Sequence, residues 1–144
     1  MSDFVKVTYG QTGKTQAPNP MGMRPMQARV YEARAAQFLL LKAPPAAGKS
    51  RALMFVALDK LENQGVGKVI ICVPETSIGA SFRSTDLTSY GFFADWEVQT
   101  RWNLCLNGAE EGSTTRKVRA VKEFMASEDR VLVCTHATFR FAFD

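Results

Sequence analysis

A loop of small residues followed by a lysine and a serine carries the residue types best suited to chemistry. Residues 43–50 read A-P-P-A-A-G-K-S, which fits the phosphate-binding pattern G-x-x-x-x-G-K-[ST] with Ala43 at the first glycine. Small residues let backbone N–H groups point at phosphate oxygens, and Gly48 permits a close approach. The Lys49 ammonium would contact the β- and γ-phosphates, and the Ser50 hydroxyl would bind Mg²⁺. The sequence therefore predicts binding of ATP with Mg²⁺ and makes Lys49 the candidate catalytic residue.

The other residues of the loop are expected to contact the nucleotide as well. Pro45, Ala46 and Ala47 lie inside the loop, and Arg51 directly follows it. Arg51 could contact a phosphate or lie on the surface. Ala43 can replace glycine if its backbone φ is negative. The alternative interpretation of the whole segment is a chance turn between a strand and a helix.

Such a loop needs a strand before it and a helix after it, and the sequence predicts both. Residues 38–41 form a short apolar run that is typical of a buried parallel strand. Residues 49–62 have the pattern of an amphipathic helix that ends at Asn63-Gln64-Gly65. The positive N-terminal end of this helix would face the phosphates.

The rest of the chain continues the alternation of strands and helices. The further predicted elements are a helix over residues 26–34, a strand over 69–73, a short helix over 77–83, a helix from Ser113 or Thr114 to Ala126, and a strand over 131–134. Residues 84–112 have no clear pattern, although residues 96–100 alternate like a strand. This order predicts the α/β class, with a parallel sheet flanked by helices on both faces.

Composition and net charge limit the number of domains and the kinds of binding partner. The chain has 144 residues, enough for one domain, of which 46% are hydrophobic. Residues 1–22 are rich in Gly, Gln, Asn, Thr and Pro, which predicts a flexible lead-in before a nucleotide-binding domain over residues 23–144. The net charge is +4, and the surplus falls in residues 1–42. This surplus is compatible with polyanion binding, but a solvated tail would explain it equally well.

The sequence lacks the features of membrane, secreted and metal-binding proteins. No apolar run is long enough to span a bilayer, and the N-terminus does not resemble a signal peptide. We therefore expect no membrane partner and a cytoplasmic location. Cys72, Cys105 and Cys134 are widely spaced without a C-x-x-C pair, which argues against zinc or redox chemistry. Cys72 and Cys134 lie in apolar runs and are predicted to be core residues.

A complete ATPase also needs an acid that follows a strand, to hold Mg²⁺ and orient the attacking water. Asp59 falls inside the helix after the loop, and Glu75 follows Pro74. The strand at 131–134 leads to Thr135 and His136, without an acid. We expect that the domain is truncated before this strand and its acid, which together are called the Walker B motif.

Taken in order, four segments resemble the first RecA-like domain of superfamily 2 helicases and translocases, particularly the motor subunits of type I and type III restriction enzymes. Residues 23–27, M-R-P-M-Q, resemble a segment whose glutamine reads adenine. Residues 43–50 resemble motif I, and residues 69–77 resemble motif Ia. Residues 131–139 resemble a later motif in which a strand ends in threonine and contacts the nucleic-acid backbone.

The resemblance implies a RecA-like P-loop NTPase domain, here partial, from an ATP-dependent helicase or translocase. It implies that Gln27 and Arg24 contact the nucleotide. The implied nucleic-acid contacts, with DNA favoured over RNA, are Pro74, Thr76, Thr135 and His136. Family members have a second RecA-like domain that supplies an arginine finger. Without that domain, this chain alone is expected to be inactive or very slow as an ATPase. The sequence departs from the family pattern at two positions: Ala43 stands in place of glycine, and the acid Glu75 stands where a nucleic-acid contact is expected.

Two other functions fit parts of the sequence. A P-loop kinase of a small metabolite would need an arginine-rich lid, for which residues 116–119 are a candidate, although they fit a helix face better. A non-enzymatic nucleic-acid-binding module would rest on the basic lead-in alone. The aromatic residues of the region without a clear pattern could stack on bases or pack in the core. They are Tyr90, Phe92, Phe93, Trp96 and Trp102.

Overall fold

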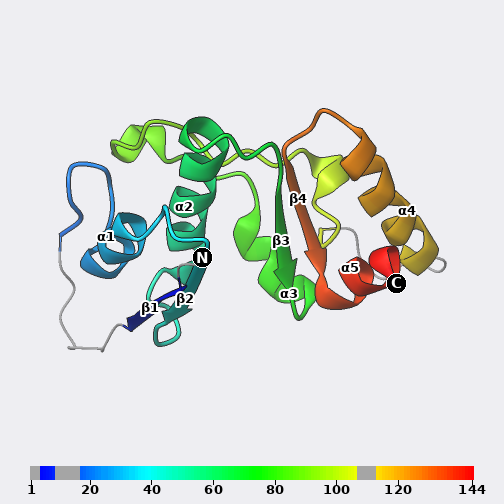
Figure 1. The fold of residues 1–144 in the computed structure, drawn as a ribbon, viewed down its shortest axis with the longest axis horizontal. Helices are drawn as coiled ribbons and strands as arrows, with labels where there is room; N and C mark the ends of the chain where they lie inside the picture. Colours follow the sequence, from blue (N-terminus) through cyan, green and yellow to red (C-terminus); the bar gives the residue numbers. More distant parts are fainter. Residues whose placement is uncertain (1–3, 9–16, 107–112) are drawn as a thin grey trace. The chain divides into compact units, whose positions relative to one another are not determined.

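The computed structural model describes residues 4–8, 17–106 and 113–144 (Figure 1). The chain divides into two compact units, each of which contains two parallel strands and flanking helices. We call Met1–Val66 with Asp86–Asp95 the N-terminal unit, and Gly67–Thr85 with Trp96–Asp144 the C-terminal unit. The fold is therefore of the α/β class, as predicted. Its strands form two two-stranded sheets within the described residues, where we expected one sheet.

The N-terminal unit contains the candidate phosphate loop. Its elements are β1 (Phe4–Thr8), α1 (Pro25–Glu32), β2 (Phe38–Lys42), α2 (Lys49–Asn63) and the 3-10 helix η2 (Thr88–Tyr90). Strand β1 pairs in parallel with β2, with Phe4 opposite Phe38. This strand corrects our expectation that residues 1–22 have little structure, since F-V-K-V-T alternates and Val7 is buried. The parts of the lead-in at residues 1–3 and 9–16 lie outside the described residues.

One face of the β1–β2 sheet is packed and the other is exposed. On the packed face, Val7 joins Met26 and Val30 of α1 and Ala52 and Val56 of α2 in a buried cluster. On the other face, Phe4, Phe38 and Leu40 are 66%, 49% and 46% exposed. Within the described residues, this sheet therefore does not have the helices on both faces that the sequence predicted.

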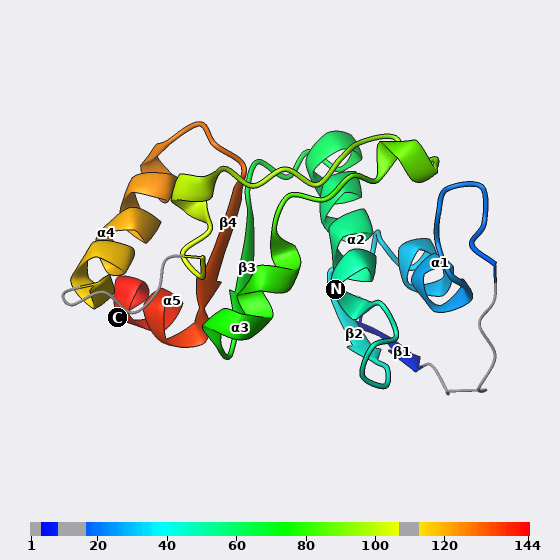
Figure 2. The same cartoon turned by 180° about the vertical axis from the view of Figure 1, so that it is seen from behind.

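The C-terminal unit is built around a second parallel pair. Its elements are β3 (Val69–Val73), α3 (Thr76–Gly79), the 3-10 helices η1 (Ala80–Phe82) and η3 (Thr100–Trp102), α4 (Ser113–Ala126), β4 (Val131–Thr135) and α5 (His136–Phe143) (Figures 1 and 2). Val69 of β3 lies opposite Val131 of β4. These strands and α4 confirm the predicted elements, and the helix predicted at 77–83 is divided into α3 and η1.

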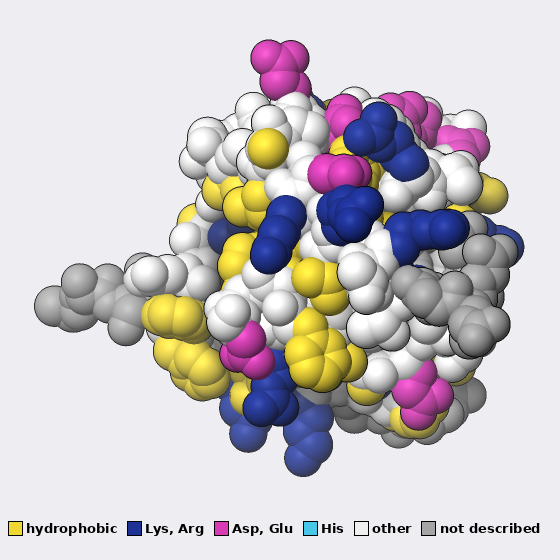
Figure 3. Space-filling model, turned by 90° about the vertical axis from the view of Figure 1, so that its right-hand side faces the viewer, with side chains coloured by type: hydrophobic (Ala, Val, Ile, Leu, Met, Phe, Trp, Pro, Cys, Tyr) yellow, Lys and Arg dark blue, Asp and Glu magenta, His cyan; other side chains and the backbone are white. Residues whose placement is uncertain are grey.

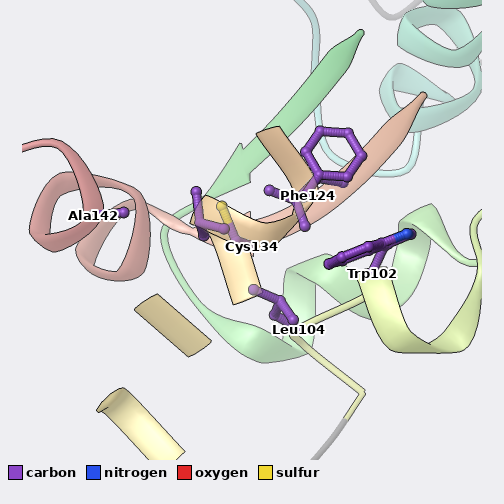
Figure 4. Close-up of a cluster of buried hydrophobic side chains, with 7 residues drawn as sticks. Trp102, Leu104, Phe124, Cys134 and Ala142 are labelled. Carbon is purple, nitrogen blue, oxygen red and sulfur yellow. The ribbon is translucent and has the colours of Figure 1, made fainter. Parts of the chain in front are cut away.

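The core of the C-terminal unit surrounds β4 (Figure 4). The buried cluster consists of Trp102, Leu104, Val121, Phe124, Leu132, Cys134 and Ala142. Trp102 and Phe124 meet edge to face with ring centroids 5.4 Å apart, and the indole N–H of Trp102 donates to Asp129 at 2.7 Å. Cys134 is buried as predicted, and Cys72 opposite it is half-buried.

Residues 96–100 are not the strand that their alternation suggested. Trp96 forms only an isolated antiparallel bridge to Thr85, and η3 begins at Thr100. The alternation of apolar and polar residues instead corresponds to alternating burial, because Trp96 and Val98 are buried while Glu97 is exposed. The indole N–H of Trp96 donates to the carbonyl oxygen of Phe82 at 2.8 Å, which fixes this extended segment inside the unit.

The surface of the C-terminal unit on the side of α4 and α5 is mixed in character. Basic, acidic and hydrophobic side chains are interspersed there (Figure 3). The large hydrophobic residues exposed on the two helices are Met125, Phe141 and Phe143. Among the described residues, no helix has both the length and the apolar character that crossing a membrane requires.

Candidate phosphate-binding site

The structure places the loop between a strand and a helix, as the sequence predicted. Strand β2 ends at Lys42, and α2 begins at Lys49. Gly48 is the N-cap of α2 with φ 91°, a left-handed conformation that favours glycine. Ala46, with φ 62°, is the only non-glycine residue of positive φ among the described residues. Ala43 therefore does not need the freedom of glycine, which accounts for its tolerance at the first position of the pattern.

The backbone donors of this segment lie in its second half. Pro44 and Pro45 have no N–H, so donors for an anion begin at Ala46. The N–H groups in the first turn of a helix have no acceptor one turn earlier within that helix. The first such bond of α2 runs from Ala52 to the carbonyl oxygen of Gly48, at 3.1 Å. The first turn, together with the partial positive charge of the helix end, is thus suited to hold an anion.

The Lys49 side chain reaches back across the loop. Its ammonium donates to the carbonyl oxygen of Ala43 at 3.0 Å, in an exposed position. A single exposed hydrogen bond of this kind contributes little net stability, so the ammonium could exchange it for a phosphate oxygen. Ser50, the candidate Mg²⁺ ligand, is half-buried in the first turn of α2.

Gln27 and Arg24 lie next to the loop although they precede it by about twenty residues. The amide of Gln27 is buried; its Nε2 donates to the carbonyl oxygen of Gly48 at 3.1 Å. Its Oε1 accepts the backbone N–H of Arg24 at 2.8 Å. A Cβ at Gly48 would come within 2.5 Å of Gln27 Nε2 and 4.0 Å of Arg24 Nη1. Packing thus joins the start of α1 to the loop.

The Arg51 guanidinium lies beside an aromatic ring, and the sequence did not predict that this ring would be near the loop. The guanidinium lies 5.8 Å from the ring centroid of Tyr90. Tyr90 belongs to the segment Asp86–Asp95, which is part of the N-terminal unit. The only sequence signal for such a contact is a cluster of aromatic residues around Gly91, which also fits core packing.

Asp59 has a structural environment distant from the loop. It lies ten residues after Lys49, which is about 15 Å along a helix axis. Its carboxylate accepts hydrogen bonds from Tyr31, Asn63 and Gln64 at 2.7–3.0 Å and pairs with Arg34 at 3.3 Å. Burial raises the pKa of Asp59, but these hydrogen bonds and the Arg34 charge outweigh it and leave the pKa below its ordinary value.

The four candidate nucleic-acid contacts gather at one edge of the C-terminal sheet. Pro74 follows β3, and Thr135 ends β4 opposite Val73. Thr76 begins α3, His136 begins α5, and both are exposed. Thr135 is half-buried and caps α5, because its hydroxyl accepts the N–H of Thr138 at 3.3 Å. Glu75 is exposed at the same edge, so the surface is not uniformly suited to phosphate.

The described residues contain no group of three His, Cys, Asp or Glu side chains that could hold a metal ion. Ser50 offers one hydroxyl oxygen. Mg²⁺ is often held by one or two protein oxygens with the remaining ligands from substrate phosphates and water. The residues present therefore fit a Mg²⁺ ion that arrives with a nucleotide, and they do not form a metal site of their own.

The fold and the site together define an α/β protein with a phosphate-loop sequence at the start of a helix. Over all its 144 residues the chain is 56% identical to the Bacillus subtilis (strain 168) protein named "Putative ATP-dependent helicase YeeB". It spans 23% of the length of that protein. No protein-family model matches the chain, and no solved structure matches it significantly. The chain is thus similar along its whole length to one part of a protein that is named as a helicase.

Proposed function

We propose that this chain is the ATP-binding part of an ATP-dependent nucleic-acid helicase or translocase with a RecA-like motor domain. The observation that carries the proposal is the A-P-P-A-A-G-K-S loop between β2 and α2, in a chain 56% identical to a protein named as a helicase. The loop supports ATP binding, and the relative supports the use of ATP on nucleic acid. The resemblance to type I and type III restriction motors makes DNA the favoured substrate.

In this proposal each part of the loop has a separate role. The backbone N–H groups of Ala46 and of residues 48–51 bind phosphate oxygens, while that of Ala47 donates to the Pro44 carbonyl oxygen. Lys49 leaves the Ala43 carbonyl to contact the β- and γ-phosphates. Mg²⁺ neutralises charge on the phosphates, and the Ser50 hydroxyl is this chain's ligand to it. Gln27 fixes the Gly48 carbonyl, and its role in reading the edge of adenine is the one that the family resemblance implies.

The edge formed by Pro74, Thr76, Thr135 and His136 is the proposed contact to the nucleic-acid backbone. Hydroxyl groups, backbone N–H groups and helix N-termini are common donors to phosphate oxygens. Such contacts position a strand without reading its sequence. A helicase needs this property, because it must move along any sequence.

Hydrolysis is proposed to need more than the residues of this chain. The relative is longer, and a motor cycle closes a second domain over the nucleotide. In the described residues Asp59 is engaged in a structural network, and Glu75 is the N-cap of α3 in the other unit. We therefore expect this chain to bind ATP weakly and to hydrolyse it slowly.

The proposal is tested by calorimetric titration of the protein with Mg·ATP and Mg·ADP. Lys49→Ala should abolish binding, whereas Lys122→Ala, a matched removal of an exposed lysine on α4, should leave it unchanged. Equal binding by the wild type and Lys49→Ala would contradict the role of the loop. Binding of single-stranded DNA without any nucleotide binding would instead indicate a non-enzymatic nucleic-acid-binding module.

A further inference from the structure

The segment Asp86–Asp95 is anchored to the N-terminal unit by its aromatic residues. Phe92 is buried, with its ring centroid 5.7 Å from that of Tyr31 and 4.7 Å from that of Phe55. Leu87 is also buried. Tyr31 lies on α1 and Phe55 on α2, so the segment packs on the helix that follows the loop and on the helix whose first turn contacts it.

Two glycines bring this segment against the residues that precede α1. A Cβ at Gly22 would come within 2.8 Å of Tyr90 Cβ and 2.9 Å of its carbonyl oxygen. A Cβ at Gly91, where φ is 109°, would collide with the carbonyl oxygen of Pro20. Only hydrogen atoms fit at these two positions. The backbone of Tyr90 is therefore fixed two residues from Arg24, whose side chain adjoins Gly48.

The ring of Tyr90 nevertheless remains exposed. Its exposed fraction is 61%, while Phe92 in the same segment is buried. The Arg51 guanidinium lies 5.8 Å from the centroid of this ring. Arg51 directly follows Ser50, the last residue of the loop. An exposed aromatic ring thus lies next to the planar cation of a residue in the first turn of α2. Both groups are suited to stack on a nucleobase.

We propose that Tyr90, with Arg51, is the stacking platform for the purine base of the nucleotide whose phosphates the loop binds. This inference rests on the proposed function, because the loop must hold the phosphates for the base to reach Tyr90. Stacking uses the π-face that every base has, so the platform adds affinity without choosing between purines. Gln27, whose amide donates to the Gly48 carbonyl, would then supply any preference for adenine.

Inorganic triphosphate separates this proposal from the proposed function, because it carries the phosphates without a base. In calorimetric titrations with Mg²⁺ present, Tyr90→Ala should weaken ATP and GTP binding by about tenfold or more, as expected for loss of one stacked base. Its binding of inorganic triphosphate should be unchanged. Lys49→Ala should lose all three ligands. Tyr90→Phe keeps the ring and should bind like the wild type.

A matched control is Phe141→Ala, which removes an exposed aromatic ring from α5 in the other unit and should alter no affinity. Tyr90→Leu keeps apolar bulk near Gly22 and should behave like Tyr90→Ala, so a packing defect cannot mimic the result. Equal ATP affinity in the wild type and Tyr90→Ala would overturn the platform while leaving the loop intact. If the wild type binds neither ATP nor inorganic triphosphate, both proposals fail together.

Discussion

Strands β2 and β4 differ in burial although each begins with four apolar residues. In β4, the strand V-L-V-C-T, the first four residues are buried. In β2, the strand F-L-L-L-K, half-buried residues alternate with exposed ones. An apolar run therefore indicates a strand of a parallel sheet, but it does not determine how much of that strand the surrounding chain covers. Burial depends on helices and loops that come from distant parts of the sequence.

The largest expected change in the free energy of unfolding distinguishes the buried strand β4 from the partly exposed strand β2. Leu132→Ala in β4 should lower the free energy of unfolding by about 3 kcal/mol, because it leaves a cavity in a closed core. Leu40→Ala in β2 should cost less than about 1 kcal/mol, since the side chain is already half exposed. Urea titration checks both: tryptophan fluorescence follows the C-terminal unit and far-UV circular dichroism follows the chain. Equal costs would remove the distinction between the sheets.

The next effect concerns the polar core of the N-terminal unit. Asp59→Ala should cost about 2 kcal/mol, because the Tyr31 hydroxyl and the amides of Asn63 and Gln64 lose their acceptor. Thermal unfolding measures the loss. Glu32→Ala, which changes an exposed acid on α1, is the control and should change stability little. If Asp59→Ala is as stable as the control, the network does not hold α1 to α2.

The same carboxylate predicts a pH dependence of stability. The pKa of Asp59 is lowered in the folded protein, so its stabilising contribution is present above its ordinary pKa of 3.8. That contribution is lost as the pH falls below 3.8 through the folded pKa. Asp59→Asn should flatten this part of the acid-unfolding curve measured between about pH 5 and pH 2. A curve that retains its slope in the variant would assign the dependence to other groups.

A smaller effect is expected at the loop itself. Gly48→Ala places a Cβ in the left-handed region and 2.5 Å from Gln27 Nε2. It should cost about 1–2 kcal/mol in stability and weaken binding of Mg·ATP. The matched control is Gly67→Ala, where an added Cβ meets nothing within 4 Å. If both variants bind and unfold alike, the conformation of Gly48 is not important to the loop.

Local patterns accounted for most of the elements. Helix α4 has clear amphipathic periodicity, and the β-branched run at Val69–Val73 favoured a strand. Helix α2 was also predicted, but its residues 54–59 are buried in succession, so it is not the amphipathic helix that we expected. Strand β1 was missed because five alternating residues lie among polar and glycine-rich neighbours. The alternation at residues 96–100 misled for the opposite reason: buried side chains in an extended loop have the same period as a strand.

The candidate site was predictable only where it is continuous in sequence. The loop at Ala43–Ser50 and its strand and helix follow one another, so the pattern was sufficient to place them. The hydrogen bond from Gln27 to Gly48 and the position of Tyr90 beside Arg51 join residues that are 21 and 39 positions apart. Such contacts depend on packing, and no local pattern predicts them.

Binding of a nucleotide by the loop can be observed residue by residue with nuclear magnetic resonance. The amide spectrum of the ¹⁵N-labelled protein would be recorded during titration with Mg·ADP. The signals of Ala46 and of residues 48–51 should move first and furthest, because their N–H groups contact the phosphates, and Lys49→Ala should abolish these changes. Loop signals that stay in place at saturating nucleotide, while others move, would contradict nucleotide binding by the loop.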